Sequence, residues 1–320
     1  MDRKAWLGSA LLACGLSTPC LPLPAADGPP RFSVAAPGGK VTFVVYGDTR
    51  FTRRESADAA ARRALVAGIA RESPAAIFIG GDLIDRGDDP DDYATYANET
   101  ADWSRRKIPV FPALGNHEFT DCRPSREDSP CLENWWSTFG ALRPWRWYSV
   151  AIGNSLLAIV LDSDAPLRPG SAQRTWLERQ ISAADTDPRL RFILVLLHYP
   201  PVRDPIFPRG RDEEQVQRYL SAAAPGLRAR VIVVGSHVHN YERFERDGVV
   251  YLVSGGGGAK PRPVLRMSGE LSQLPTPVNF HYLRMTLAGD RLEATMVRFE
   301  ANAAGGDPWS EPDGFEIRSR

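Results

Sequence analysis

From residue 40 onward, short runs of apolar and β-branched residues alternate with longer segments of helical periodicity. This alternation constrains the fold more than any other feature, because it is typical of a sheet whose faces are covered by helices. The pattern predicts strands at 41–46, 76–79, 110–114, 156–161, 191–197 and 231–234. It predicts helices at 56–72, 91–106, 132–139, 172–183 and 212–223. We therefore expect an α/β fold.

The C-terminal part of the chain has a different pattern. Three strand-like segments lie there, at 249–253, 279–287 and 291–299. A Gly-Asp pair separates the last two, so we expect antiparallel strands that extend a sheet. Residues 260–277 contain four prolines and predict a long surface loop. Because no repeat or Ser/Gly linker divides the chain, residues 31–320 are expected to form one domain.

The N-terminal residues are typical of an export signal. A charged segment, 1–4, precedes a short apolar run, 5–13. This run is shorter than the roughly 20 residues that a membrane-spanning helix needs, so we expect no transmembrane segment. Cleavage after a signal peptide of residues 1–26 is favoured over cleavage before Cys14, which resembles a bacterial lipoprotein signal and would leave that cysteine lipidated. Either site predicts an exported protein, periplasmic or secreted.

Cys122 and Cys131 are the two cysteines that remain after such a leader is removed. In an oxidising compartment the simplest interpretation is a disulfide that closes a small loop. A metal site is the alternative, but no second cysteine pair or adjacent histidine supplies the other ligands.

The charge of the chain limits its partners. Lys and Arg number 39, and Asp and Glu also number 39, so the formal net charge is zero. A nucleic-acid-binding protein usually has a basic excess or stripe, so we expect no nucleic-acid partner. Any attraction for an anion has to come from a local site.

Polar residues follow five of the predicted strands at their carboxyl ends, where α/β sheets bind ligands. They are Asp48, Asp82, Asn116 with His117, His198, and His237 with His239. Each of them alone would be a common turn or capping residue. Together they hold four of the five histidines of the chain. Carboxylate, carboxamide and imidazole groups are the ligands of divalent and trivalent metal ions, so this set predicts a metal site.

The series resembles the metallophosphoesterase, or calcineurin-like phosphoesterase, family. That family has the blocks Asp-x-His, Gly-Asp-x-x-Asp, Gly-Asn-His-Glu/Asp, His and Gly-His-x-His, and the resemblance runs over 48–239. Segments 237–243 and 251–258 are most similar to the purple acid phosphatase branch. The resemblance implies an αββα sandwich of two β-sheets flanked by helices. It also implies that residues 31–320 form a catalytic domain that hydrolyses small phosphorylated substrates.

The resemblance further implies two metal ions, either divalent or trivalent, for which Fe, Mn and Zn are the candidates. Six side chains would ligate them: Asp48, Asp82, Asn116, His198, His237 and His239. Asp82 would bridge the ions, while Asp48 and His239 would complete the first site and the other three the second. Such a centre polarises phosphoryl oxygens and lowers the pKa of bound water, which gives a metal-bound hydroxide as the nucleophile.

The same resemblance gives roles to three further residues and a second role to Asn116. His117 would protonate the leaving alkoxide or hydrogen-bond the phosphate, and Asn116 would also contact substrate. Asp85 and Glu118 would orient ligands.

Three positions depart from the family pattern. Arg50 stands where the family has a histidine ligand, and an arginine cannot coordinate a metal. Its guanidinium suits either a phosphate of the substrate or a structural salt bridge, for example to Asp48. Phe51 lacks the phenolate of purple acid phosphatases, so no purple colour is expected. Ser236 replaces a glycine, without an expected loss of metal binding.

Two functions remain in competition. The leading hypothesis is an exported, metal-dependent phosphoric ester hydrolase. The alternative is a metal-binding but catalytically degenerate relative, because Arg50 removes a ligand of the first ion. Counting the bound metal ions and measuring phosphate release would separate the two. The remaining histidine, His281, is expected to be a structural residue of a strand.

Overall fold

The structure is a computed structural model that describes residues 28–120, 122, 131–204, 206, 210–301 and 306–320. The predicted signal peptide, 1–26, and Cys14 lie outside this part of the chain. Within it, no helix is both long and apolar enough to cross a membrane.

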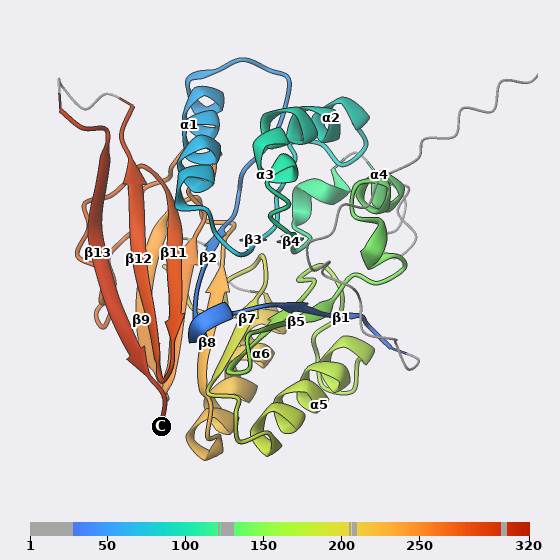
Figure 1. Cartoon of the computed structure of the whole chain (residues 1–320), viewed down its shortest axis with the longest axis vertical. Coiled ribbons are helices and arrows are strands. Elements are labelled where there is room, and N and C mark those ends of the chain that lie inside the picture. Colours follow the sequence, from blue (N-terminus) through green and yellow to red (C-terminus); the bar gives the residue numbers. More distant parts are fainter. Residues whose placement is uncertain (1–27, 121, 123–130, 205, 207–209, 302–305) are drawn as a thin grey trace, which may run out of the picture.

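Two mixed β-sheets pack face to face between layers of helices (Figure 1). The seven-stranded sheet has the order β1 (Arg31–Val34), β5 (Tyr148–Ile152), β6 (Leu156–Val160), β7 (Phe192–Leu196), β8 (Arg230–Gly235), β10 (Val249–Ser254), β9 (Tyr241–Arg246). The six-stranded sheet has the order β13 (Trp309–Arg318), β12 (Arg291–Phe299), β11 (Phe280–Ala288), β2 (Lys40–Tyr46), β3 (Ile77–Ile79), β4 (Val110–Pro112). The predicted αββα fold is confirmed.

Helices cover the outer faces of the sandwich. They are α1 (Ala57–Glu72), α2 (Pro90–Glu99), α3 (Ala101–Arg105), α4 (Cys131–Thr138), α5 (Ala172–Thr186) and α6 (Arg211–Ala223). In Figure 1, α1 to α4 lie on one side of the sheets, with α5 and α6 on the other. Short 3-10 turns complete the described elements: η1 (Pro37–Gly39), η2 (Asn116–Phe119), η3 (Gly140–Leu142) and η4 (Ala224–Gly226).

Alternate residues of the central strands fill two separate cores, because side chains along a strand point to opposite faces. In β7, Phe192, Leu194 and Leu196 face the core between the sheets. Ile193 and Val195 join a second core under α5 and α6. The strands are apolar throughout because both faces are covered.

All predicted strands are present, including the antiparallel extension, in which β11 pairs with β2 and β12. The prediction of a single helix over 91–106 is wrong, because α2 ends at Glu99 and α3 begins at Ala101, with Thr100 between them. The Thr100 hydroxyl donates to the carbonyl of Tyr96 at 2.7 Å, a bond that competes with regular helix geometry.

The sequence pattern missed β1, β5, β9 and β13. Three of these, β1, β9 and β13, are edge strands. Edge strands tolerate charged residues, proline and glycine, and β13 contains Pro312 and Gly314. Their sequences therefore lack the continuous apolar run by which the central strands were identified.

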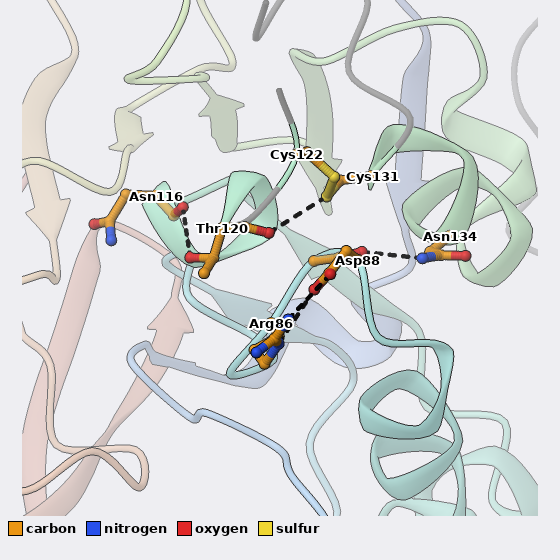
Figure 2. Close-up of a disulfide and its surroundings, with 8 residues drawn as sticks. Arg86, Asp88, Asn116, Thr120, Cys122, Cys131 and Asn134 are labelled. Carbon is orange, nitrogen blue, oxygen red and sulfur yellow. Dashed lines mark hydrogen bonds and ion pairs between the residues drawn. A yellow bond between two sulfur atoms is a disulfide. The ribbon is translucent and has the colours of Figure 1, made fainter. Parts of the chain in front are cut away.

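The predicted Cys122–Cys131 disulfide is present, with the two Cα atoms 5.9 Å apart. Figure 2 shows it beside the turn that carries Asn116. The Sγ atom of Cys131 lies 3.7 Å from the carbonyl oxygen of Thr120, just beyond η2. From α4, Asn134 donates to the carbonyl of Gly87 at 3.0 Å. The disulfide and α4 thus support the loops that follow β3 and β4 of the six-stranded sheet.

Candidate metal centre

The loops at the strand ends have an uncommon backbone conformation. Five non-glycine residues there have positive φ: Asp48, Arg50, Asp82, His237 and His239. This region is disfavoured for residues with a Cβ atom, so it persists where surrounding structure holds it. Hydrogen bonds between the loops hold this conformation. The N–H of Asp48 donates to the carbonyl of Gly81, and the N–H of Arg50 donates to the carbonyl of Asp82, both at 3.0 Å. Contacts between the loops therefore set the direction of these side chains.

Asp48, Asp82 and His198 meet at the rim formed by the carboxyl ends of β2, β3 and β7. They come from both sheets, and none of the three has an exposed surface. One potential ligand atom of each lies within 4.8 Å of the other two. The arrangement is a group of buried metal-ligating side chains.

His198 has its Nδ1 atom 2.9 Å from the carbonyl oxygen of Gly80. Because a carbonyl only accepts, Nδ1 carries the proton of the neutral ring and Nε2 is left with a lone pair. Burial favours this state, since it lowers the pKa of His198. The ring is thus in the tautomer that binds a metal through Nε2.

Three further potential ligands converge on that Nε2 atom. Asn116 Oδ1 lies 3.2 Å away, Asp82 Oδ1 3.3 Å away and His237 Nδ1 3.2 Å away. The two oxygens are acceptors, so they do not satisfy a lone pair. A bound cation would satisfy all of these groups together. Asp82, Asn116, His198 and His237 therefore fit the second ion of the predicted centre.

Asp48 is an orphaned buried carboxylate. Neither of its oxygens makes a hydrogen bond to the described residues within normal geometry. Burial raises the pKa of Asp48 well above its usual value, and the nearby Asp82 carboxylate adds to the rise. A buried carboxylate without a partner is costly, and a metal ion beside it would remove that cost.

Asp82 differs from Asp48 in its partners. Burial alone would raise the pKa of Asp82, but the neighbouring His198 and Arg50 together hold it below the usual value. Its Oδ2 atom lies 2.9 Å from Nη2 of Arg50 and 3.1 Å from Nε. Arg50 thus forms a salt bridge, as one of the two sequence interpretations had it, but to Asp82 and not to Asp48.

His239 lies on the Arg50 side of the centre. Its Nδ1 atom is 3.2 Å from the carbonyl oxygen of Lys260, and its Nε2 atom is 3.4 Å from Arg50 Nη2 and 3.6 Å from Asp48 Oδ1. Burial lowers the pKa of His239 to about 3, and the charge of Arg50 contributes. Burial likewise lowers the pKa of His237 to about 3. Both rings are therefore neutral and able to accept a bond at neutral pH.

His117, in η2, stands beside these residues without joining them. Its backbone N–H donates to Asp82 Oδ1 at 2.9 Å, and its Nδ1 lies 2.6 Å from the carbonyl oxygen of Asp85. The side chain is 22% exposed, so it is open to solvent on the rim. In this tautomer Nε2 is the ring atom left to exchange a proton.

Glu118 joins two of the ligand loops. Its carboxylate accepts backbone N–H groups of Asp82 at 3.0 Å, Leu83 at 2.7 Å and Gly115 at 2.6 Å. The structure therefore supports the orienting role that the sequence predicted for Glu118.

Ser236 occupies space that two glycines leave free. A Cβ atom on Gly47 would come within 2.2 Å of the Ser236 hydroxyl, and one on Gly80 within 2.3 Å. The hydroxyl donates to the carbonyl of Ser254 at 3.0 Å. The serine thus packs between the two sheets, directly before His237.

A cleft of about 620 Å³ opens beside Arg50 and His239. Its lining includes basic side chains from two segments: Arg50 and Arg54 after β2, and Lys260 and Arg262 after β10. The acidic lining residues are Asp58 and Asp85. No sequence pattern marks Lys260 and Arg262 as site residues, because they lie in a loop whose position depends on the tertiary fold.

Other candidate residues have structural roles. Arg86 pairs with Asp88 at 3.1 Å and Arg243 with Asp313 at 2.9 Å. His281 is fully buried in β11, the strand position that the sequence predicted.

The comparisons with known proteins match this geometry. A family model described as calcineurin-like phosphoesterase matches residues 41–241. None of the curated proteins matches the chain in sequence.

Several solved structures share the fold. A dimetal phosphatase from Danio rerio has a TM-score of 0.56 and 16% identity, covering 88% of this chain and 99% of its own. GAP50, described as the anchor in the inner membrane complex of Plasmodium, has a TM-score of 0.57 and 15% identity over 88% of this chain and 89% of its own. PhoD has a TM-score of 0.62 and 12% identity over 91% of this chain and 72% of its own.

Proposed function

Because the chain belongs to the calcineurin-like phosphoesterase family, we propose that it is a metal-dependent hydrolase of phosphoric esters. The observation that carries this proposal is the convergence of Asp82, Asn116 and His237 on the lone pair of His198. Such a set of buried and half-buried ligand groups is suited to a divalent or trivalent cation, of which Fe, Mn and Zn are the candidates.

Asp82, Asn116, His198 and His237 would hold the ion, with Asp48 beside it. A bound ion of this kind polarises a phosphoryl oxygen and lowers the pKa of water toward about 7. The predicted centre also has a first ion, on Asp48, Asp82 and His239, a site in which Arg50 already contacts Asp82 and His239.

Side chains on the rim would supply proton donation and substrate binding. We assign proton donation to the leaving group to Nε2 of His117 in its doubly protonated form, because the Nδ1–H is bonded to the Asp85 carbonyl. Transfer of the Nε2 proton to the leaving oxygen leaves the ring neutral. The amide of Asn116 and the guanidinium of Arg50 would contact the phosphate. Lys260, on the cleft wall, would attract the anionic substrate, which the neutral chain as a whole does not.

Export is part of the proposal. The disulfide between Cys122 and Cys131 supports an oxidising compartment, such as the periplasm or the extracellular medium. Residues 31–320 would then be the mature catalytic domain.

The decisive experiment is a phosphate-release screen with phosphomonoesters and phosphodiesters, on protein loaded separately with Fe, Mn and Zn. We expect turnover that chelation abolishes and metal restores. The variant His198→Ala should lose both the bound metal and turnover, whereas His281→Gln should keep both.

The alternative function is a metal-binding relative without catalysis, and Arg50 in the ligand set is the observation that favours it. Protein that binds metal normally but releases no phosphate from any ester of the screen would establish this alternative.

A further inference from the structure

The position of Arg50 bears on how many ions the centre holds. The first ion of the predicted pair would rest on Asp48, Asp82 and His239. Arg50 Nη2 lies 2.9 Å from Asp82 Oδ2 and 3.4 Å from His239 Nε2, and Nη1 lies 3.5 Å from Asp85 Oδ1. The guanidinium therefore contacts two of the three side chains that the first ion would need.

Arg50 contacts the same atoms of Asp82 and His239 that would coordinate the first ion. With Nδ1 of His239 donating to Lys260, Nε2 is its lone-pair atom, and it faces Arg50. The Oδ2 atom of Asp82 faces Arg50 as well, while Oδ1 faces His198. Asp82 therefore points Oδ1 toward the site of the second ion and Oδ2 toward the Arg50 guanidinium.

The backbone of Arg50 is held rigidly in this orientation. Its N–H donates to the carbonyl of Asp82 at 3.0 Å, and its own carbonyl accepts from Nη1 of Arg62 at 2.8 Å. Arg62 is 2% exposed and is fixed in turn by Glu99 at 2.8 Å. Arg62 thus fixes the backbone from which the Arg50 side chain extends, and the contacts with Asp82 and His239 hold the guanidinium itself.

Charge argues against an ion in the same place. A guanidinium stays protonated in proteins and offers no lone pair. A metal ion within about 4 Å of it would be repelled by several kcal/mol at the effective dielectric of a protein surface. The positive charge that balances Asp82 is already supplied by the chain itself.

We infer that Arg50 takes the place of the first metal ion, so that the centre holds a single ion beside a fixed guanidinium. This inference rests on the proposed metal binding and changes the predicted dinuclear centre into a mononuclear one. His239 then accepts a hydrogen bond from Arg50 instead of ligating a metal. The guanidinium has five N–H groups, and those left over by Asp82 and His239 line the cleft where the phosphate would lie.

The test is a Mn²⁺ titration of the metal-free mature protein, followed by elemental analysis and electron paramagnetic resonance. We expect one bound ion per chain with the spectrum of an isolated ion. His239→Ala should keep that ion, whereas His198→Ala should lose it. Arg50→His should gain a second ion and a spin-coupled spectrum. Arg53→His, three residues along and paired with exposed Asp91, is the matched control and should remain at one ion.

Two bound, spin-coupled ions in the unmodified protein would overturn the inference, as would loss of the single ion in His239→Ala. Neither result depends on whether Arg50→His folds. Failure of the proposed function gives a different outcome, namely normal metal stoichiometry without phosphate release.

Discussion

The carboxylate of Glu118 accepts the backbone N–H of Asp82 at 3.0 Å, so a buried acid fixes the loop that carries this candidate metal ligand. The same carboxylate accepts the N–H groups of Leu83 and Gly115. Glu118 thereby ties the loop after β3 to the loop after β4. Glu118 therefore acts on the position of the metal ligands, because its side chain is buried and its carboxylate bonds backbone N–H groups.

Glu118→Gln should therefore weaken metal binding by at least about 10-fold, in the range seen for residues that orient ligands. The amide NH₂ group would oppose a backbone N–H, so a thermal unfolding midpoint should fall as well. Metal affinity measured by calorimetry checks the first effect. Glu133→Gln, an exposed change at a residue paired with Arg143, is the control and should leave affinity unchanged.

His117→Asn should lower kcat by about 100-fold or more while leaving metal content unchanged, because His117 is assigned to proton donation rather than ligation. The loss should be largest for esters with poorly acidic leaving alcohols, which need the proton most. A plot of log kcat against leaving-group pKa should steepen in the variant. An equal loss for all leaving groups would contradict the assignment.

Lys260→Ala should raise KM several-fold with little change in kcat, because Lys260 lines the cleft and is exposed. The effect should shrink at high salt, where exposed charges more than about 10 Å apart are screened. Initial rates at two ionic strengths measure this. Lys40→Ala removes the same charge at the opposite end of β2 and should leave KM unchanged.

The Cys122–Cys131 disulfide should contribute about 3 kcal/mol to the free energy of unfolding, as expected for so short a closed loop. The double variant Cys122→Ser, Cys131→Ser should unfold at lower urea concentration. Its kcat should also fall, because the disulfide lies against the turn that bears Asn116 and His117 (Figure 2). A loss of stability without any change in kcat would show that the turn does not need this support.

The low pKa of His281 predicts that the free energy of unfolding depends on pH. Burial lowers its pKa from 6.5 to about 4, so the unfolded chain binds a proton that the folded chain excludes. Its contribution is present above pH 6.5 and is lost as the pH falls toward 4. Between pH 7 and pH 5 this amounts to about 2 kcal/mol. Urea unfolding of His281→Gln should show a smaller fall over that interval than unfolding of the unmodified protein.

The strands that build the core were predictable because their apolar runs are continuous over five or six residues, as in β7 and β8. Edge strands such as β13 were not, because burial on one side only leaves a pattern that proline and charge interrupt. The break between α2 and α3 escaped prediction for a related reason. It depends on one hydroxyl of Thr100, which a periodicity over many residues does not register.

The ligand set itself was contained in the sequence, because its chemistry depends on residue type and on adjacency to a strand end. Asp48, Asp82 and His198 could be selected in this way before their positions in space were known. The same holds for the anomaly at Arg50, which stands out against the Asp-x-His block of the family.

What Arg50 does was decided by the tertiary structure. Its contacts with Asp82 and His239 span 32 and 189 residues of sequence. They depend on a positive φ at Arg50 that is held by Asp82, 32 residues away, and by Arg62, 12 residues away. The basic wall of the cleft likewise required the loop after β10 to fold back beside β2. Local sequence carries the identity of chemical groups, whereas their mutual distances follow from packing and hydrogen bonds between segments that are remote in the chain.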